Sequence, residues 1–335
     1  MSNGKMTSVK LAKLAGVSHA TVSRVFNNST KVTEKTRDKI LQLASEYGYR
    51  PNAIATSLNR SQSGLVAIIV NDTSDLWECE QLSLLTNDLL NVGLMPLVLN
   101  CSQQNDKLSI MNMASSYQVD FTIIFSEIVA FEEVCNIFKY SKTIVIANEE
   151  QAHHGHASII MDPSSAIREA IDFMVASGRR HFFYLSGRIT SWIDKQRRAS
   201  YVDNLNRHGL KLIGEAQGNY KYDSGVKEAL MILKKPIKVD AIIAGNDVMA
   251  CGVKDAAERL LGLNVPQDLA ILGYDGIELA HWDSFDLSTI TVEQQALSNA
   301  IIAQIEYFRT YIHSQEQNRP EPITVTSAFR KGKTT

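Results

Sequence analysis

Short continuous apolar runs alternate with longer amphipathic stretches through most of the chain after residue 63. The apolar runs lie at 65–70, 94–99, 121–125, 143–147, 182–185, 241–243 and 270–272. Helical periodicity occupies the intervals, at 77–92, 105–117, 131–139, 164–177, 195–208, 223–234 and 247–261. Apolar strands that do not alternate with polar residues are typical of parallel sheets with helices on both faces. The pattern therefore predicts a doubly wound α/β body.

The pattern before residue 63 is different and predicts two short helices joined by a tight turn. Four apolar residues recur at helical spacing and pack the two helices together: Leu11, Leu14, Val22 and Val25. Gly16 tolerates the left-handed turn that ends the first helix. The hydroxyl of Ser18 then caps the second helix. Another set of residues is left on the outer face of this helix: His19, Ala20, Ser23 and Arg24.

This arrangement, with the N-terminal end of the second helix exposed, has the geometry that enters the major groove of DNA. Charge supports the same interpretation independently. Residues 1–63 hold ten Lys and Arg against three Asp and Glu, a net charge of +7, whereas the whole chain carries −2, which leaves −9 for the remaining residues. A basic head on an acidic body indicates a polyanion partner for the head. A basic, merely solvated helical face is the alternative.

Composition limits the class of protein. The chain has 335 residues, of which 44% are hydrophobic and 21% charged. Removal of the head leaves roughly 270 residues, enough for two lobes. The N-terminus lacks the apolar core of a secretion signal, and no stretch reaches the roughly 20 apolar residues of a membrane span. The cysteines lack paired CxxC spacing, which indicates reduced packing residues in a cytoplasmic protein: Cys79, Cys101, Cys135 and Cys251.

Motifs for catalysis and for metal binding are weak. The chain has no HExxH, phosphate-loop or GxSxG motif. The run His153-His154-Gly155-His156 could bind a transition metal, but no cysteine or pair of acids lies nearby at ligand spacing. The sequence therefore predicts no catalytic residue, no metal and no other cofactor.

Four segments before residue 53 carry a family resemblance. Residues 14–18, 21–25, 36–37 and 47–52 read LAGVS, TVSRV, TR and YGYRPN. In this order they resemble the DNA-binding head of the lactose-repressor/galactose-repressor (LacI/GalR) family. The family adds a third helix, here begun by Thr33 and stopped at Gly48. One departure is Lys10, which stands where the family often has an acidic residue.

The resemblance implies roles for residues of the second helix. His19 and Ala20 match positions that read base edges, and Arg24 matches an arginine that contacts bases and phosphates. Phosphate oxygens are left to a further set: Ser18, Thr21 and Ser23. Arginine can bond a guanine edge bidentately, imidazole can donate or accept, and a methyl group can touch thymine. Simple solvent exposure is the alternative for His19.

A short hinge helix at about 52–58 is also implied, ordered only in the DNA-bound dimer. Asn52 stands at its entry after Pro51 and belongs to the DNA-contacting set. Leu58 lies in an otherwise polar stretch and matches a leucine that enters the minor groove from both subunits and kinks the duplex. The alternative is that Leu58 packs on the body or on the partner's hinge.

The expected fold is therefore an all-α helix-turn-helix head plus an α/β body like that of periplasmic binding proteins, with two doubly wound lobes and parallel sheets. The head spans 1–50 and the hinge with its linker 51–63. The effector-binding and dimerisation domain spans 64–335. Its N-lobe covers about 64–161 and 292–324, and its C-lobe covers about 162–291 and 325–335. The resemblance implies three chain crossings between the lobes, which we place near Asp162, 289–292 and 324–328.

Ligands of such sheets bind beyond the carboxyl ends of the strands, here between the lobes. The effector-binding candidates follow strands or match family positions: Trp77, Asn148, Arg197, Tyr220, Asn246 and Asp275. A carboxylate and an amide can bond vicinal hydroxyls, arginine donates in a fork, and an aromatic ring covers an apolar sugar face. This donor set suits a sugar or sugar derivative.

Asn148, after the fourth strand, is the weaker candidate, and the other five also have a structural interpretation. Trp77 is equally suited to core packing, and Tyr220 competes with Tyr222 for the aromatic role. Asp247 is better explained as a helix N-cap than as a ligand residue. Asn246 could be a simple turn residue, Asp275 a structural acid and Arg197 a surface arginine.

The predicted function is a ligand-responsive, sequence-specific transcriptional regulator, most simply a repressor of carbohydrate uptake or catabolism genes. Two copies form a homodimer on a pseudo-palindromic operator in double-stranded DNA. The alternative is a constitutive or architectural DNA-binding protein with a vestigial effector pocket. Residues 71–77 keep this alternative open, because they lack the proline and the aromatic pair found there in many relatives.

Overall fold

In the computed structural model the chain forms two compact units, residues 1–63 and 64–335, which we call the head and the body. The structure describes residues 6–26, 30–51, 62–70, 75–101, 106–125, 131–147, 156–188, 192–311 and 320–335. Three of the predicted site residues lie outside these ranges: Asn52, Leu58 and Asn148. The predicted hinge helix at 52–58 lies outside them as well.

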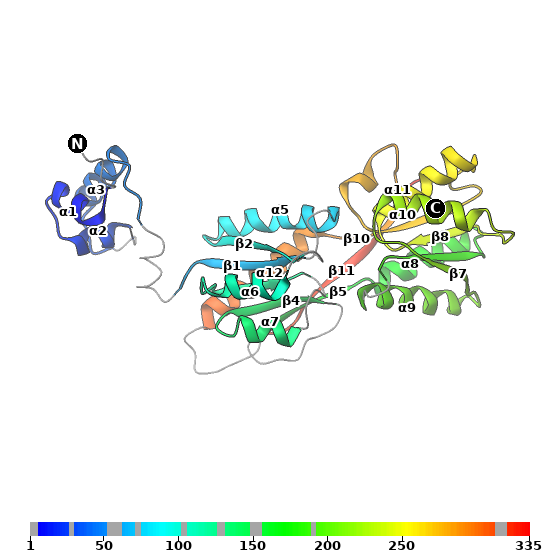
Figure 1. Cartoon of the computed structure of the whole chain (residues 1–335), viewed down its shortest axis with the longest axis horizontal. Coiled ribbons are helices and arrows are strands. Elements are labelled where there is room, and N and C mark those ends of the chain that lie inside the picture. The colour runs from blue at the N-terminus through cyan, green and yellow to red at the C-terminus, as the bar shows by residue number, and fades with distance from the viewer. Residues whose placement is uncertain are drawn as a thin grey trace. The chain divides into compact units, whose positions relative to one another are not determined.

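Helices α1 (Ser8–Ala15), α2 (His19–Phe26) and α3 (Glu34–Glu46) form the described part of the head (Figure 1). As predicted, α1 ends at Gly16, whose φ is 71°. Ser18 Oγ accepts a hydrogen bond from the Thr21 backbone N–H at 3.1 Å, which caps α2. All three helices contribute to one core: Leu11, Ala12, Ala15, Val22, Val25, Ile40 and Ala44.

Leu14 is not part of this core, contrary to the prediction. Its side chain is 48% exposed, whereas Leu11 is fully buried. The buried stripe of α1 passes through positions 11, 12 and 15, and at 100° per residue Leu14 lies about 100° from the centre of that stripe. Helical spacing from Leu11 alone therefore assigned Leu14 to the wrong face.

The strands of the body follow one another in the hydrogen-bonded order β2-β1-β3-β4-β5-β11-β10-β9-β8-β6-β7. Their bounds are β1 Leu65–Val70, β2 Met95–Asn100, β3 Phe121–Ile124, β4 Lys142–Ala147, β5 His156–Asp162, β6 Phe182–Ser186, β7 Leu212–Gln217, β8 Ala241–Ala244, β9 Ala270–Asp275, β10 Ser288–Val292 and β11 Ile323–Arg330. Within the described residues, β10 and β11 pair antiparallel and the other neighbours pair parallel.

Figure 1 shows β5, β10 and β11 running between two α/β lobes. We call the half built on β1–β5 the N-lobe and the half built on β6–β9 the C-lobe. The helices of the body are α5 Leu76–Asn91, α6 Lys107–Ser115, α7 Phe131–Ile137, α8 Ser164–Ala176, α9 Trp192–Arg207, α10 Tyr222–Leu233, α11 Asp247–Asp255 and α12 Gln294–Tyr311. A π-helix, η1 Ala256–Leu260, follows α11, and a 3-10 helix, η2 Glu278–His281, follows β9.

Each lobe buries both faces of its sheet. In β1, for example, Val66 and Ile68 belong to one core cluster, whereas Ala67 and Ile69 belong to another. Alternate side chains of a strand point to opposite faces, so both faces are covered. The C-lobe has two such clusters as well. The predicted doubly wound α/β fold is confirmed.

The sequence predicted no strand at β5, β7, β10 or β11 and no helix at α12, although chain crossings were expected near the end of β5 and within β10 and β11. The residues of β7 alternate between half-buried and exposed, as expected of a strand at the end of the sheet order, so the run is not continuously apolar. The helix predicted at 247–261 ends as an α-helix at Asp255. No helix among the described residues is long and apolar enough to cross a membrane. None of the four cysteines, which all lie in the described residues, forms a disulfide bond.

Candidate DNA-binding face and effector site

The outer face of α2 has the predicted residues. Val22 and Val25 are almost fully buried, which fixes the opposite side of the helix toward solvent. The exposed set is the one expected from the sequence: His19, Ala20, Ser23 and Arg24. A base-reading role for these residues is a prediction that rests on this exposure and on the geometry of the motif.

Two basic residues of the head are engaged within the fold. Lys39 Nζ donates to the backbone carbonyl of Ala15 at 2.9 Å, and Arg37 Nη1 donates to that of Val25 at 3.3 Å. Both carbonyls lie in the last turns of α1 and α2, where cations offset the helix dipole. Part of the positive charge that the sequence analysis assigned to DNA attraction therefore also stabilises the three-helix arrangement.

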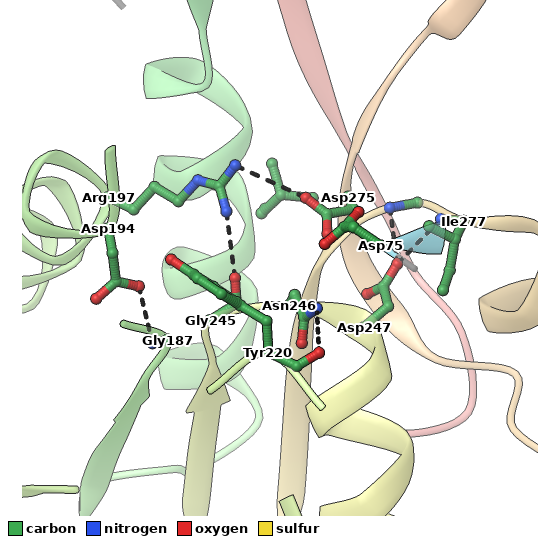
Figure 2. A network of polar contacts seen from close by, with 12 residues as sticks. Asp75, Gly187, Asp194, Arg197, Tyr220, Gly245, Asn246, Asp247, Asp275 and Ile277 are labelled. Atoms are coloured by element: carbon green, nitrogen blue, oxygen red, sulfur yellow. Dashed lines mark hydrogen bonds and ion pairs between the residues drawn. The ribbon is translucent and has the colours of Figure 1, made fainter. Parts of the chain in front are cut away.

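In the body, Arg197 lies in a network at the carboxyl ends of the C-lobe strands (Figure 2). Its Nη1 donates to the carbonyl of Gly245, after β8, at 3.2 Å. Its Nη2 lies 3.7 Å from Oδ1 of Asp275, the last residue of β9. The guanidinium also stacks on Tyr274 at 3.5 Å from the ring centroid. Arg197 is therefore mostly buried and is not the surface arginine that the alternative interpretation proposed.

Asp275 is held in an unusual backbone conformation. Its φ is 111°, a region that L-residues rarely adopt and that is often found at functional sites. Burial raises the pKa of Asp275 well above its usual range, although Arg197 lowers it, and the nearby carboxylates of Asp75 and Glu80 raise it further. Figure 2 shows Asp75 beside Asp275. A ligand with hydroxyl or ammonium donors would satisfy this group of acids better than an anionic one.

Asn246, and not Asp247, is the helix cap at this position. Asn246 is the N-cap of α11, because its Oδ1 accepts from the Met249 backbone N–H at 2.9 Å. Its Nδ2 donates to the Tyr220 carbonyl at 3.2 Å. Asp247 is fully buried, and its Oδ2 accepts from the backbone N–H groups after β9. Desolvation raises the pKa of Asp247 to about 7. The expectation that Asp247 caps the helix is wrong.

Tyr220 lies against the strand ends and Tyr222 does not. A β-carbon built on Gly187, just after β6, would lie 1.8 Å from the Tyr220 ring, so the ring packs directly on that glycine. Tyr220 has a φ of 65°. Tyr222 instead donates its hydroxyl to Asp255 at 2.6 Å on the side of α10 and α11. Tyr220 is thus the tyrosine that adjoins the Arg197 network.

Residues of α5 bring the N-lobe to the same region. Trp77 packs against core clusters of both lobes, in agreement with the core-packing interpretation, and its effector role stays a prediction. Its indole N–H is buried and has no hydrogen-bond partner in the part of the chain that the structure describes. Glu80 was not predicted from the sequence; its Oε1 accepts from the Glu278 backbone N–H at 3.1 Å. A charged residue on an otherwise ordinary helix gives no sequence signal for such a contact.

The structure therefore brings Arg197, Tyr220, Asn246 and Asp275 together, with Trp77 on the N-lobe side. Their effector-binding roles stay predictions. The described residues contain no group of three or more His, Cys, Asp or Glu that could hold a metal ion. His153 and His154 lie outside the described residues.

A helix-turn-helix head joined to a two-lobed body with a polar network at its strand ends defines the class of ligand-responsive transcriptional regulators. Residues 10–52 match the model of bacterial regulatory proteins of the lacI family, and residues 171–328 match a periplasmic binding protein-like domain. Catabolite control protein A of Priestia megaterium is 32% identical over 280 residues, which covers 82% of this chain and 84% of that protein. The chain belongs to the LacI family.

Other relatives and solved structures agree. The transcriptional repressor CytR of Escherichia coli strain K12 is 28% identical over 283 residues, covering 84% of this chain and 83% of CytR. The fold matches a lac repressor dimer bound to operator and the anti-inducer ONPF, with a TM-score of 0.86 at 24% identity over 98% of each chain. A CelR–cellobiose complex matches with a TM-score of 0.70 at 19% identity over 98% of this chain and 100% of that one. The predicted family is confirmed.

Proposed function

We propose that this protein is a homodimeric repressor whose affinity for a pseudo-palindromic operator depends on a sugar or sugar derivative bound between its lobes. The observation that supports this proposal most strongly is the Arg197–Asp275 network at the strand ends. The same chain has an exposed face on α2, which we propose reads DNA. Membership of the family indicates a regulator. We assign DNA binding to the face of α2 and effector binding to the Arg197–Asp275 network.

On the DNA side, each α2 enters a major groove and presents His19, Ala20 and Arg24 to base edges. Hydroxyl groups on the same helix end contact phosphate oxygens, from Ser18, Thr21 and Ser23. Asn52 and Leu58 complete the DNA-contacting set at the hinge. As a DNA-binding regulator, the protein acts in the cytoplasm and catalyses no reaction.

On the effector side, the carboxylate of Asp275 accepts from ligand hydroxyls, and the ring of Tyr220 or Trp77 covers an apolar ligand face. Asn148, Arg197 and Asn246 belong to the same proposed site. The hydrogen bonds that Asn246 makes to Met249 and Tyr220 suit an indirect role that sets the position of Tyr220. A ligand can change operator affinity only as far as it binds one lobe arrangement better than the other.

The Arg197–Asp275 pair lies at the carboxyl ends of the C-lobe strands, which is where folds of this class bind their ligands. This location favours a working sensor over a constitutive DNA-binding protein. The proposed domain limits are those of the sequence analysis, with the hinge at 51–63 and the crossings near Asp162, 289–292 and 324–328.

The test uses the full chain, an operator selected from random duplexes, and a panel of neutral sugars, amino sugars, hexuronates and hexose phosphates. Compounds that raise the melting temperature of the protein are added to the operator complex. We expect at least one neutral or amino sugar to change operator affinity about fivefold or more, with no such change in the Asp275→Asn variant. Sugars that bind and leave operator affinity unchanged would contradict the proposal.

A further inference from the structure

A hydrogen bond links the first turns of α1 and α2 in the head. Ser8 Oγ lies 2.9 Å from Nε2 of His19, with ten residues between them in the sequence. Ser8 is the first residue of α1 and His19 the first residue of α2. The contact therefore joins a residue outside the recognition helix to a side chain on its exposed end.

The contact changes what His19 can offer to DNA. An imidazole ring has two nitrogen atoms, and a neutral ring uses one as donor and the other as acceptor. With Nε2 engaged by the Ser8 hydroxyl, Nδ1 is the nitrogen left for a base edge. The hydroxyl rotates to donate or accept, so it supports either tautomer while it holds the plane of the ring.

Neighbouring hydroxyls in the head have a different use. Thr7 Oγ1 accepts from the Lys10 backbone N–H at 3.3 Å, and Ser18 Oγ accepts from the Thr21 backbone N–H. These two groups cap α1 and α2 respectively. The Ser8 hydroxyl instead contacts the side chain of His19, so it orients the imidazole ring and does not cap a helix.

We propose that Ser8 is a positioning residue for base readout: it fixes the His19 ring so that Nδ1 faces the major groove. This inference rests on the proposed function, and it adds a specificity-determining residue outside α2. Preorganisation of this kind improves recognition because the orientation of the side chain is fixed before DNA arrives. An exposed hydrogen bond between neutral groups contributes little to folding, so its removal should leave the head folded.

The experiment compares base preferences of the full chain by selection from random duplexes, followed by affinity measurements on single-base variants of the selected site. The variants are His19→Ala, Ser8→Ala and Ser8→Thr. Ser45→Ala is the matched control, because Ser45 is an exposed serine on α3. His19→Ala identifies the base pair that His19 reads, as the position at which discrimination is lost.

We expect Ser8→Ala to lower discrimination about threefold to tenfold at that same base pair, with little change at other positions. Ser8→Thr keeps the hydroxyl and should retain the wild-type preference, as should Ser45→Ala. A structural role for Ser8 would instead lower affinity evenly at every position, which would overturn the inference. A change at a base pair other than that of His19 would also overturn it, because Ser8 would then read DNA directly.

Failure of the proposed function gives a different result. If the wild-type chain selects no common DNA site, the proposed function as a sequence-specific regulator is contradicted. A wild-type chain that selects a site which Ser8→Ala reads with the same discrimination would overturn only the role of Ser8.

Discussion

Arg197 and Asp275 form a largely shielded ion pair, whereas Arg198, the next residue along α9, forms an exposed one. The Arg197 and Asp275 side chains are 17% and 13% exposed. Arg198 pairs with Glu215, and both of these side chains are 41% exposed. The two adjacent arginines therefore allow an arginine–carboxylate ion pair shielded from water to be compared with an exposed one.

Asp275→Ala should destabilise the body far more than Glu215→Ala. Removal of one partner of a buried pair leaves the other charge uncompensated, which costs about 3 kcal/mol. The exposed pair should contribute less than about 1 kcal/mol, because water screens it. Urea unfolding of each variant measures both values. Equal losses of unfolding free energy in the two variants would show that the Arg197–Asp275 pair contributes no more to stability than the exposed Arg198–Glu215 pair.

The stability of the body should depend on pH through Asp247. The pKa of this carboxyl is about 7 in the folded body against an ordinary value of 3.8, so the folded state retains a proton that the unfolded chain releases. The resulting stability is present below about pH 4 and is lost as pH rises through 7, with a slope of at most about 1.4 kcal/mol per pH unit.

Asp247→Asn tests the assignment, because an amide oxygen can still accept from the backbone of Gly276 and Ile277 but does not titrate. The free energy of unfolding, measured from pH 5 to pH 8, should fall less steeply in this variant than in the wild type. Identical pH profiles would show that Asp247 is ionised in the folded body at all these pH values.

Glu80 should hold the two lobes in their present arrangement. Its Oε1 accepts from the Glu278 backbone N–H in the C-lobe, and its Oε2 accepts from Gln294 Nε2 at 3.0 Å. Of these two bonds, the one to Glu278 crosses between the lobes, since Gln294 begins α12, which packs on the N-lobe core. A hydrogen bond to a charged acceptor contributes about 2 kcal/mol, so Glu80→Ala should shift the body toward more separated lobes. Small-angle X-ray scattering would detect this shift as a larger radius of gyration.

Glu306→Ala is the control for this effect. Glu306 is also a helical glutamate, but its carboxylate pairs with Arg309 on the same helix, α12, at 2.7 Å. Its removal should leave the radius of gyration unchanged. If Glu80→Ala and Glu306→Ala give the same scattering, Glu80 does not restrain the lobes.

Substitution of Arg24 should affect DNA binding, whereas substitution of Lys39 should affect the stability of the head. Arg24 is exposed on α2, so Arg24→Met should weaken operator binding and reduce its dependence on salt. Lys39 donates to the Ala15 carbonyl, so Lys39→Met should lower the free energy of unfolding of the head by about 1 kcal/mol. Binding measured over a salt series and thermal unfolding distinguish the two. Equal salt slopes for both variants would contradict this division of roles.

The sequence predicts best where a pattern has one physical explanation. The apolar run 65–70 coincides with β1, because a run this short, rich in Val and Ile and preceded by Gly64, favours a buried strand over a helix. Gly16 and Ser18 identify the turn between α1 and α2 because left-handed backbone and an N-cap hydroxyl each favour few residue types. In contrast, β7 alternates in burial and contains Gly214, so its pattern is compatible with a loop.

The site was predicted less well than the fold, because local signals do not define distant partners. Asn246 and Asp247 are both good N-caps, and only the position of the segment after β9 explains why Asp247 is buried. Glu80 and Glu278 are 198 residues apart, and neither lies in a motif. Arg197 was found through family resemblance, whereas its stacking on Tyr274 could be seen only in the folded chain.

The most direct test of the account is to map binding of the purified full chain across fragmented host DNA at a stated salt concentration, since phosphate contacts make affinity strongly salt-dependent. The account predicts a few discrete sites that share one pseudo-palindromic sequence and lie beside genes for transport or catabolism. Uniform binding with no shared sequence would contradict it.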